Sequence, residues 1–273
     1  MIALSALGSG SGGNAFVLDG PDGALLVDAG FTAKELERRA TLVGVDLSRV
    51  HGVVLTHEHG DHATGSVRIA KRLGVPLVAT EGTLRSLAPP EGVDRVMLRS
   101  SSIAELGPFS IESCRIIHDA AEPTALAVEY QEVRLGVAYD FGRATLGLRH
   151  LLRGCDALVV ESNYDEIMLR TSDYPVSVQH RIAGSGGHLS NRAAAELLAD
   201  LCHDGLGVVV LAHLSRQCNA PEVAHSTVAG YLGVRGFTGR IAVATQDTPV
   251  GPLPISASGA RHRLATQCEL EFS

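Results

Sequence analysis

The ten residues at 53–62 constrain the fold of this chain more than any others. Their sequence, VVLTHEHGDH, joins a short apolar run directly to three histidines and two acids. We expect residues 52–55 to form a buried strand, so that the polar residues leave it at one edge of a sheet. The side chains of ligand type here are His57, His59, Asp61 and His62. Imidazole and carboxylate together suit Zn²⁺, Mn²⁺ or Fe²⁺ rather than Ca²⁺ or Mg²⁺ alone, and the spacing allows two ions.

Strands and helices alternate along the rest of the chain. Apolar runs predict strands at residues 2–7, 15–18, 24–27, 75–79, 109–117, 125–130, 133–139, 158–160, 208–211 and 241–244. Capping residues and helical spacing predict helices at 32–43, 64–73, 148–155, 192–201 and 221–232, with Ser190 as an N-cap. This order predicts an α/β layered sheet structure with helices outside. Periodicity alone does not choose among the α/β folds.

Composition narrows the class of protein. The chain has 273 residues, a net charge of −7 and 45% hydrophobic residues, which excludes a disordered chain and a simple basic nucleic-acid module. Because no linker rich in Pro, Ser or charge interrupts it, we expect a single domain over 1–273. The five cysteines form no CxxC pair, which favours a reducing compartment. With no secretory pattern and no membrane-length apolar run, the expectation is a cytoplasmic protein without a membrane partner.

The motif His57-x-His59-x-Asp61-His62 resembles the HxHxDH signature of the metallo-β-lactamase fold superfamily. That resemblance implies a four-layer αββα sandwich over about residues 1–250. Its companions occur in the expected order: Asp28 resembles the structural aspartate, His118 the third metal motif, Asp140 the bridging aspartate and His213 the last metal histidine. Each of them also ends an apolar run. Several strand ends that deliver ligands to one sheet edge are a metal-site architecture, independently of the resemblance.

The resemblance implies two divalent metal ions per chain, Zn²⁺ or Mn²⁺. The first would be bound by His57, His59 and His118, and the second by Asp61, His62 and His213. Asp140 would bridge both, together with a water or hydroxide that attacks the substrate. No cysteine is among these ligands, so the set is unlike the thiolate-containing lactamase sites and resembles the phosphodiesterase branches.

A second group of residues resembles the tRNA 3′-processing endonuclease family. Glu161 after a strand and His188 before a helix look like that family's proton-shuttling pair, in which His188 donates a proton to the leaving alkoxide. Together with Asp61 they are the expected catalytic residues. The alternative is that His188 caps its helix and Glu161 holds a structural salt bridge. The segment 213–219 resembles the family's final HxS motif, and Arg216 within it is either a phosphate ligand or a surface charge.

Three segments, 7–14, 161–165 and 187–191, resemble a bacterial branch of small, single-domain, double-strand DNA exonuclease-like hydrolases. The resemblance implies a 5′-to-3′ DNA exonuclease. In the first segment, glycines allow close backbone approach, so Ser9, Ser11 and Asn14 are expected to bind substrate phosphate. The alternative is a flexible turn made permissive by glycine.

The acidic net charge weighs against a DNA substrate, because phosphate binding draws on lysine and arginine. Local basic clusters occur at Lys34, Arg38, Arg39; Arg68, Lys71, Arg72; Arg143, Arg149, Arg153; and Arg261, Arg263. The alternatives are therefore a phosphodiesterase for a small cyclic nucleotide or another small phosphodiester, an RNA-processing nuclease, and a metal-binding scaffold without turnover. Thioester hydrolysis is disfavoured by the Glu161 and His188 pair, and β-lactam hydrolysis by the expected compartment.

Overall fold

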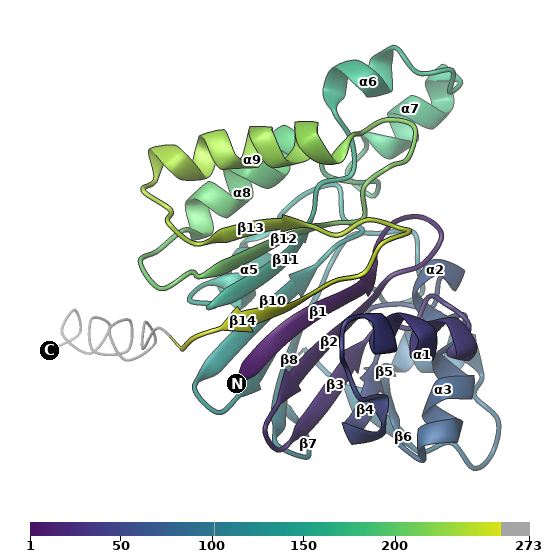
Figure 1. Ribbon diagram of the computed structural model, residues 1–273. Helices are drawn as coiled ribbons and strands as arrows, with labels where there is room; N and C mark the ends of the chain where they lie inside the picture. Colours follow the sequence, from purple (N-terminus) through teal and green to yellow (C-terminus); the bar gives the residue numbers. More distant parts are fainter. Residues whose placement is uncertain (101, 258–273) are drawn as a thin grey trace, which may run out of the picture.

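Two seven-stranded mixed sheets face each other in the computed structural model, which describes residues 1–100 and 102–257. The first sheet has the order β14-β1-β2-β3-β4-β5-β6, with strands Val250–Ile255, Ile2–Gly8, Ala15–Gly20, Gly23–Val27, Val50–Val54, Leu77–Thr80 and Arg95–Leu98. The second has the order β13-β12-β11-β10-β9-β8-β7, with strands Arg240–Val243, Val208–Ala212, Ala157–Glu161, Val133–Ala138, Thr124–Tyr130, Phe109–Arg115 and Ala104–Leu106. Figure 1 shows the two sheets packed against each other.

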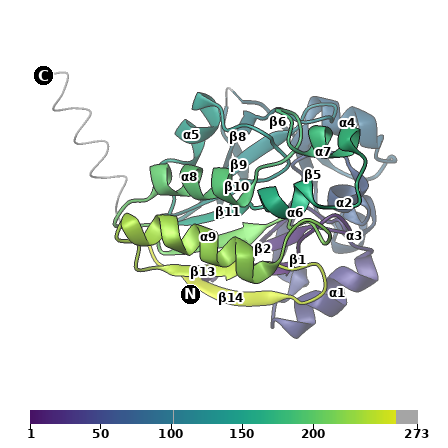
Figure 2. The same ribbon diagram turned by 90° about the horizontal axis from the view of Figure 1, so that it is seen from above.

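Helices cover the outer face of each sheet (Figures 1 and 2). Helices α1 (Ala33–Leu42) and α3 (Ser66–Leu73) pack on the first sheet, and α5 (Leu146–Leu152), α8 (Asn191–Leu201) and α9 (Pro221–Val234) on the second. Short elements complete the fold: η1 (Leu47–Arg49), α2 (Gly60–Ala63), α4 (Glu81–Leu87), α6 (Glu166–Arg170) and α7 (Val176–Ile182). Within the described residues, no helix combines the length and apolarity that a membrane crossing requires.

Three apolar layers hold the sandwich together. Between the sheets, side chains such as Phe16, Leu126 and Val137 form a fully buried core. Leu36 lies in the layer under α1, and Leu198 lies in the layer under α8. Strand residues alternate between the two faces of a sheet, so each buried strand serves one outer layer and the central one. The expected αββα sandwich is therefore confirmed.

Every element expected from periodicity is present, with one shifted boundary that matters for the site. The strand expected over 109–117 ends at Arg115, where the backbone N–H of Ile116 turns to donate to Pro123 O. His118 thus lies in a loop rather than directly at a strand end. Several elements were not expected at all: α2, α4, α6, α7, β6, β7 and β14. They are short, and β14 carries two prolines, which lack a strand's N–H donor.

The loops that carry the ligand-type residues meet because of strand direction. Strands β3 and β4 run parallel in the first sheet, and β10, β11 and β12 run parallel in the second. Parallel strands end at the same sheet edge, and the two sheets present these ends on the same side of the molecule (Figure 1).

Buried Arg39 ties α1 to this edge. Its Nη1 donates to the carbonyl oxygens of Leu7 and Gln246, both at 2.9 Å, and its Nε donates to Glu35 Oε1 at 2.6 Å. The guanidinium carbon also lies 4.1 Å from the ring centroid of Phe31. One side chain therefore holds the ends of β1, α1 and the segment after β13 together.

Replacing Arg39 with alanine is expected to lower the free energy of unfolding by about 2–4 kcal/mol, because two buried carbonyl oxygens lose their donor. Urea denaturation followed by circular dichroism measures this loss. Arg38 is the matched control, since it binds the same carboxylate of Glu35 from an exposed position. The Arg38→Ala loss should stay below about 1 kcal/mol. Equal losses in the two variants would contradict the role given to Arg39.

Candidate metal centre

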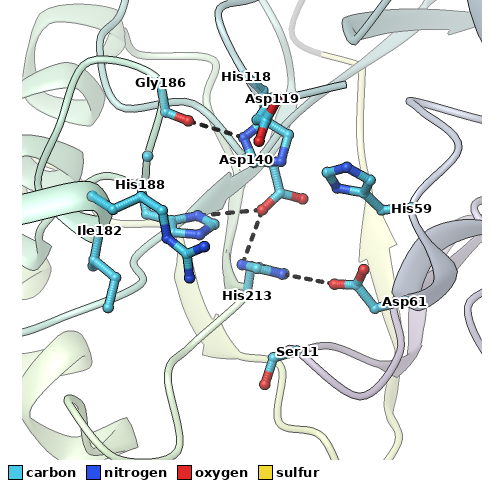
Figure 3. Close-up of a pocket in the computed structure, with 12 residues that line it drawn as sticks. Ser11, His59, Asp61, His118, Asp119, Asp140, Ile182, Gly186, His188 and His213 are labelled. Atoms are coloured by element: carbon cyan, nitrogen blue, oxygen red, sulfur yellow. Dashed lines mark hydrogen bonds and ion pairs between the residues drawn. The ribbon is translucent and has the colours of Figure 1, made fainter. Parts of the chain in front are cut away.

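The structure brings the residues of each expected ligand set together beside one cavity. His57, His59 and His118 place ligand atoms within 4.8 Å of one another, and so do Asp61, His62 and His213. Asp140 forms a further such group with His57 and His62. Figure 3 shows most of these side chains pointing toward a common centre, from loops that follow strands of both sheets.

The side chains of the first set lie close enough together to share one metal ion. The ring centroid of His57 lies 4.6 Å from the ring centroid of His59 and 5.2 Å from that of His118. His57 Nε2 is buried and makes no hydrogen bond within the described residues. Burial and the neighbouring His62 hold the pKa of His57 well below its ordinary value, which favours the neutral ring that can bind a metal ion. A buried unpaired nitrogen is costly, and a bound cation would satisfy it.

Asp140 lies between the two sets. Its Oδ2 is 2.8 Å from His62 Nε2 and 3.8 Å from His57 Nε2, while its Oδ1 is 3.3 Å from His213 Nδ1. Asp61 Oδ2 is 3.3 Å from Nε2 of both His62 and His213. The carboxylate of Asp140 therefore reaches histidines of both sets, as a bridging ligand must, and the donors fit two divalent ions.

A buried hydrogen-bond group orients His62. Asp28 Oδ2 lies 2.6 Å from His62 Nδ1 and also accepts from Thr56 Oγ1 and the hydroxyl of Tyr139. Burial lowers the pKa of His62, but the carboxylates of Asp140 and Asp28 outweigh it and raise that pKa well above the ordinary value. Because Nδ1–H is held by Asp28, Nε2 is directed to the centre. Sequence reasoning placed Asp28 beside the site but missed Thr56 and Tyr139, which carry no spacing signal.

Three residues at the site adopt the left-handed backbone conformation. The φ angles are 57° at Asp28, 60° at Asp140 and 54° at His213. Such angles are uncommon outside glycine and cost free energy unless the surroundings enforce them. Asp28 and His213 directly follow a strand, and Asp140 follows a strand after one intervening residue, so each lies in the turn that ends a strand.

Ser9 and Asn14 face into the protein. The Oγ of Ser9 donates to Asn14 Oδ1 and accepts from the backbone N–H of His213, both at 2.8 Å. Asn14 Nδ2 donates to Asp61 O at 3.2 Å and lies 3.1 Å from His62 Nε2. The glycine-rich loop therefore joins ligand loops of the two sheets.

Close packing around this loop depends on glycine. A Cβ atom on Gly30 would lie 1.8 Å from the carbonyl oxygen of Asp61, so the backbone after β3 rests directly on the second ligand set. Any larger residue would displace Asp61.

Ser11 and Arg216 differ in their position relative to the cavity. Ser11 is exposed and lines the cavity, as Figure 3 shows. Arg216 is exposed, donates to Asp247 Oδ1 at 2.7 Å and is not among the cavity's lining residues. Substrate binding by either stays a prediction, and only Ser11 has the position for direct contact.

The pair of Glu161 and His188 stands beside Asp140. Glu161 is fully buried, and its Oε2 lies 3.1 Å from His188 Nδ1, while its Oε1 accepts from the backbone N–H of Phe141 and Leu189. Burial lowers the pKa of His188, but hydrogen bonds to Asp140 and Glu161 outweigh it and raise that pKa to about 10. The raised pKa favours the protonated imidazole, which is the form that can donate a proton.

His188 is not the cap of the following helix. The N-cap of α8 is Ser190, as expected, and its side chain accepts from the N–H of Ala193. The capping part of the alternative is therefore wrong, whereas the ion pair of Glu161 that it also named is present, with His188 as the partner.

Residues of the segments 161–165, 187–191 and 213–219 meet in a buried amide network. Ser162 Oγ donates to Asn191 Oδ1 at 2.6 Å, and the amides of Asn191 and Asn219 exchange hydrogen bonds at 2.8 and 2.9 Å. Asn163, which sequence reasoning missed, donates to His213 O at 2.7 Å. These contacts hold the loop of His213 against the end of β11 and the start of α8.

Two mixed sheets between helical layers, with histidines and aspartates gathered at one edge, define a class of hydrolase. The sequence model of the Metallo-beta-lactamase superfamily matches residues 8–169, and the chain belongs to this superfamily. It is a hydrolase with the fold that implies use of divalent metal ions, which confirms the resemblance seen in the motif.

Similar proteins within the superfamily include two that are named exodeoxyribonucleases. The chain is 34% identical to exodeoxyribonuclease YycJ of Bacillus anthracis, over 86% of this chain and 90% of that protein. It is 29% identical to exodeoxyribonuclease WalJ of Streptococcus pneumoniae, over 84% of this chain and 87% of that protein. The crystal structure of the short form of human tRNase Z superposes with a TM-score of 0.61 at 16% identity, over 92% of this chain and 99% of that chain, which shows the shared fold.

Proposed function

We propose that this protein is a dinuclear-metal-dependent phosphodiester hydrolase, and that it acts as a DNA exonuclease on 5′ ends. The observation that carries the proposal is the position of Asp140 between two sets of ligand side chains, with His188 and Glu161 beside it. The names of the two exodeoxyribonuclease relatives support a DNA substrate.

The residues divide into ligands and a proton donor. His57, His59 and His118 would hold one Zn²⁺ or Mn²⁺ ion, and Asp61, His62 and His213 the other, with Asp140 shared. Two such ions supply Lewis acidity toward a phosphoryl group and activate water. His188 donates its proton to the oxygen that leaves phosphorus. Glu161 holds the imidazole in place and keeps it protonated.

Around this centre, Ser11 contacts the substrate from the cavity wall. Ser9 and Asn14 act on substrate only indirectly, because their side chains position the loops of His213 and Asp61. We also propose a cytoplasmic location, which is supported by the four described cysteines being free thiols.

The pairing of basic surface side chains with carboxylates supports a small phosphodiester as the alternative substrate. Several basic side chains of the clusters are ion-paired on the surface, among them Arg38 with Glu35, Arg72 with Glu37 and Arg149 with Asp200. Arg261 and Arg263 lie outside the described residues. Paired cations contribute little to binding of a nucleic-acid backbone.

The deciding assay offers the purified protein, with Mn²⁺ or Zn²⁺, four substrates: 5′-phosphorylated duplex DNA, single-stranded DNA, RNA and bis(p-nitrophenyl) phosphate. We expect cleavage of the small diester and stepwise loss of nucleotides from the 5′ end of DNA. Cleavage of the small diester alone would favour the small-phosphodiester alternative, and preference for RNA the RNA-processing one. Turnover of none would contradict the proposal.

A further inference from the structure

The guanidinium-bearing residue Arg181 lines the cavity, and the proposed mechanism does not use it. Among the described residues, the cavity of about 370 Å³ has Arg181 as its single lysine or arginine. Arg181 lies in α7, is exposed and forms no ion pair within the described residues, although Asp61, Asp119 and Asp140 line the same cavity. An unpaired guanidinium at a substrate cavity is available to bind an anion, and its planar fork matches phosphate oxygens.

Backbone contacts hold the backbone of Arg181 close to the loop that carries His188. The N–H of His188 donates to Ile182 O at 2.8 Å, and the N–H of Gly184 donates to Arg181 O at 3.3 Å. Gly187 packs so closely that a Cβ atom there would lie 2.3 Å from Arg181 O. The end of α7 and the loop of the proton donor therefore form one unit, and Figure 3 shows Ile182 and Gly186 of this unit on the same side of Asp140 as His188.

The position of His188 indicates whether the attacked half or the leaving half of the substrate lies near Arg181. A proton donor must reach the oxygen that departs, so the leaving half of the substrate lies on the side of His188. His59 and Asp61 lie on the other side of Asp140 in Figure 3. A phosphate that Arg181 binds therefore belongs to the leaving half and is distinct from the phosphate that is attacked.

We propose that Arg181 binds a second phosphate, carried by the leaving half of the substrate, and so gives the site a preference for 5′-phosphorylated ends. This rests on the proposed function. In hydrolysis from a 5′ end, water oxygen bonds to phosphorus, the bond from phosphorus to the 3′ oxygen of the terminal nucleotide breaks, and that oxygen takes the proton of His188. The leaving half is then the terminal nucleotide, and its remaining phosphate is the 5′ one.

The test compares kcat/KM for one blunt duplex with either a 5′-phosphate or a 5′-hydroxyl end. We expect the wild-type protein to prefer the phosphorylated end by about 10- to 100-fold, the range of a charge-assisted hydrogen bond pair. In Arg181→Gln this ratio should fall to about one, and Arg181→Lys should give an intermediate ratio because the charge stays and the fork is lost.

Arg170→Gln is the matched control. Arg170 is an exposed arginine at the end of α6, its Nε donates to Glu166 O, and it is not among the cavity's lining residues. Its variant should keep the wild-type ratio. The inference is overturned if Arg181→Gln keeps the preference, or if it slows both duplexes equally.

The failure of the proposed function has a separate signature. If the wild-type protein cleaves bis(p-nitrophenyl) phosphate and both duplexes without preference, the proposed function stands and the inference falls. If it cleaves no phosphodiester, the proposed function falls. Fluorescence anisotropy with the two duplexes then decides the inference: tighter binding of the phosphorylated end, lost in Arg181→Gln, supports it, and equal affinities overturn it.

Discussion

Asp61→Ala is expected to abolish measurable hydrolysis and to lower the metal content of the protein. Asp61 supplies the carboxylate of the second ligand set, with Oδ2 placed 3.3 Å from Nε2 of both His62 and His213. Without it, that set keeps two imidazoles and the shared carboxylate of Asp140. Since loss of a supporting residue alone costs about 10- to 100-fold in metal affinity, loss of a ligand should cost more. Elemental analysis after dialysis measures the bound metal, and bis(p-nitrophenyl) phosphate reports the rate.

Asp119→Ala is the control for Asp61. Asp119 lines the same cavity, yet it belongs to none of the ligand groups found among the described residues. Its variant should bind as much metal as the wild-type protein. Full metal content in Asp61→Ala would show that the second ligand set is wrongly assigned, and a matching circular dichroism spectrum would exclude unfolding as the cause of a loss.

His188→Ala is expected to slow DNA hydrolysis by about 10²- to 10⁴-fold while the metal content stays at the wild-type level. The leaving group of DNA is an alkoxide, which needs a proton, and His188 lies beside Asp140 with a raised pKa that favours its protonated form. Hydrolysis of bis(p-nitrophenyl) phosphate should fall far less, because p-nitrophenolate leaves without protonation. Rates on the two substrates, with elemental analysis of the same samples, measure the difference.

Glu161→Gln sharpens this result. Glutamine keeps an acceptor for the backbone N–H groups of Phe141 and Leu189 but removes the charge that favours imidazolium. The variant should show the same dependence on leaving group as His188→Ala, with a smaller loss. An equal fall on both substrates in His188→Ala would mean that His188 supports the ligands, since it also contacts Asp140, and does not supply the proton.

Much of the fold and of the ligand set could be predicted from the chain itself. The apolar run before His57 and the runs before Asp140 and His213 predict buried strands, and a polar residue after such a run must emerge at a sheet edge. The capping residues Thr32 and Ser190 also start the helices expected of them. These are local signals, carried by neighbours in sequence.

Other features arise only when distant segments meet. Nothing near Ser9 or Asn14 in sequence indicates that their side chains turn inward, because their partners at His213 and Asp61 come from other strands. In the sequence, Tyr139 has the pattern of an ordinary strand residue, and only the structure shows that its hydroxyl donates to Asp28.

The sequence by itself determined which residue types follow the strands, and its HxHxDH motif carried the resemblance to the metallo-β-lactamase superfamily that the family model confirms. Only the tertiary structure decided which side chains face the cavity and which support the ligands. Arg181 shows the difference. It lies in a short helix with no periodic signal, and it lines the cavity because backbone hydrogen bonds hold the end of α7 against the loop of His188. The physical reason is that a hydrogen bond depends on distance in space, whereas a sequence pattern records only distance along the chain.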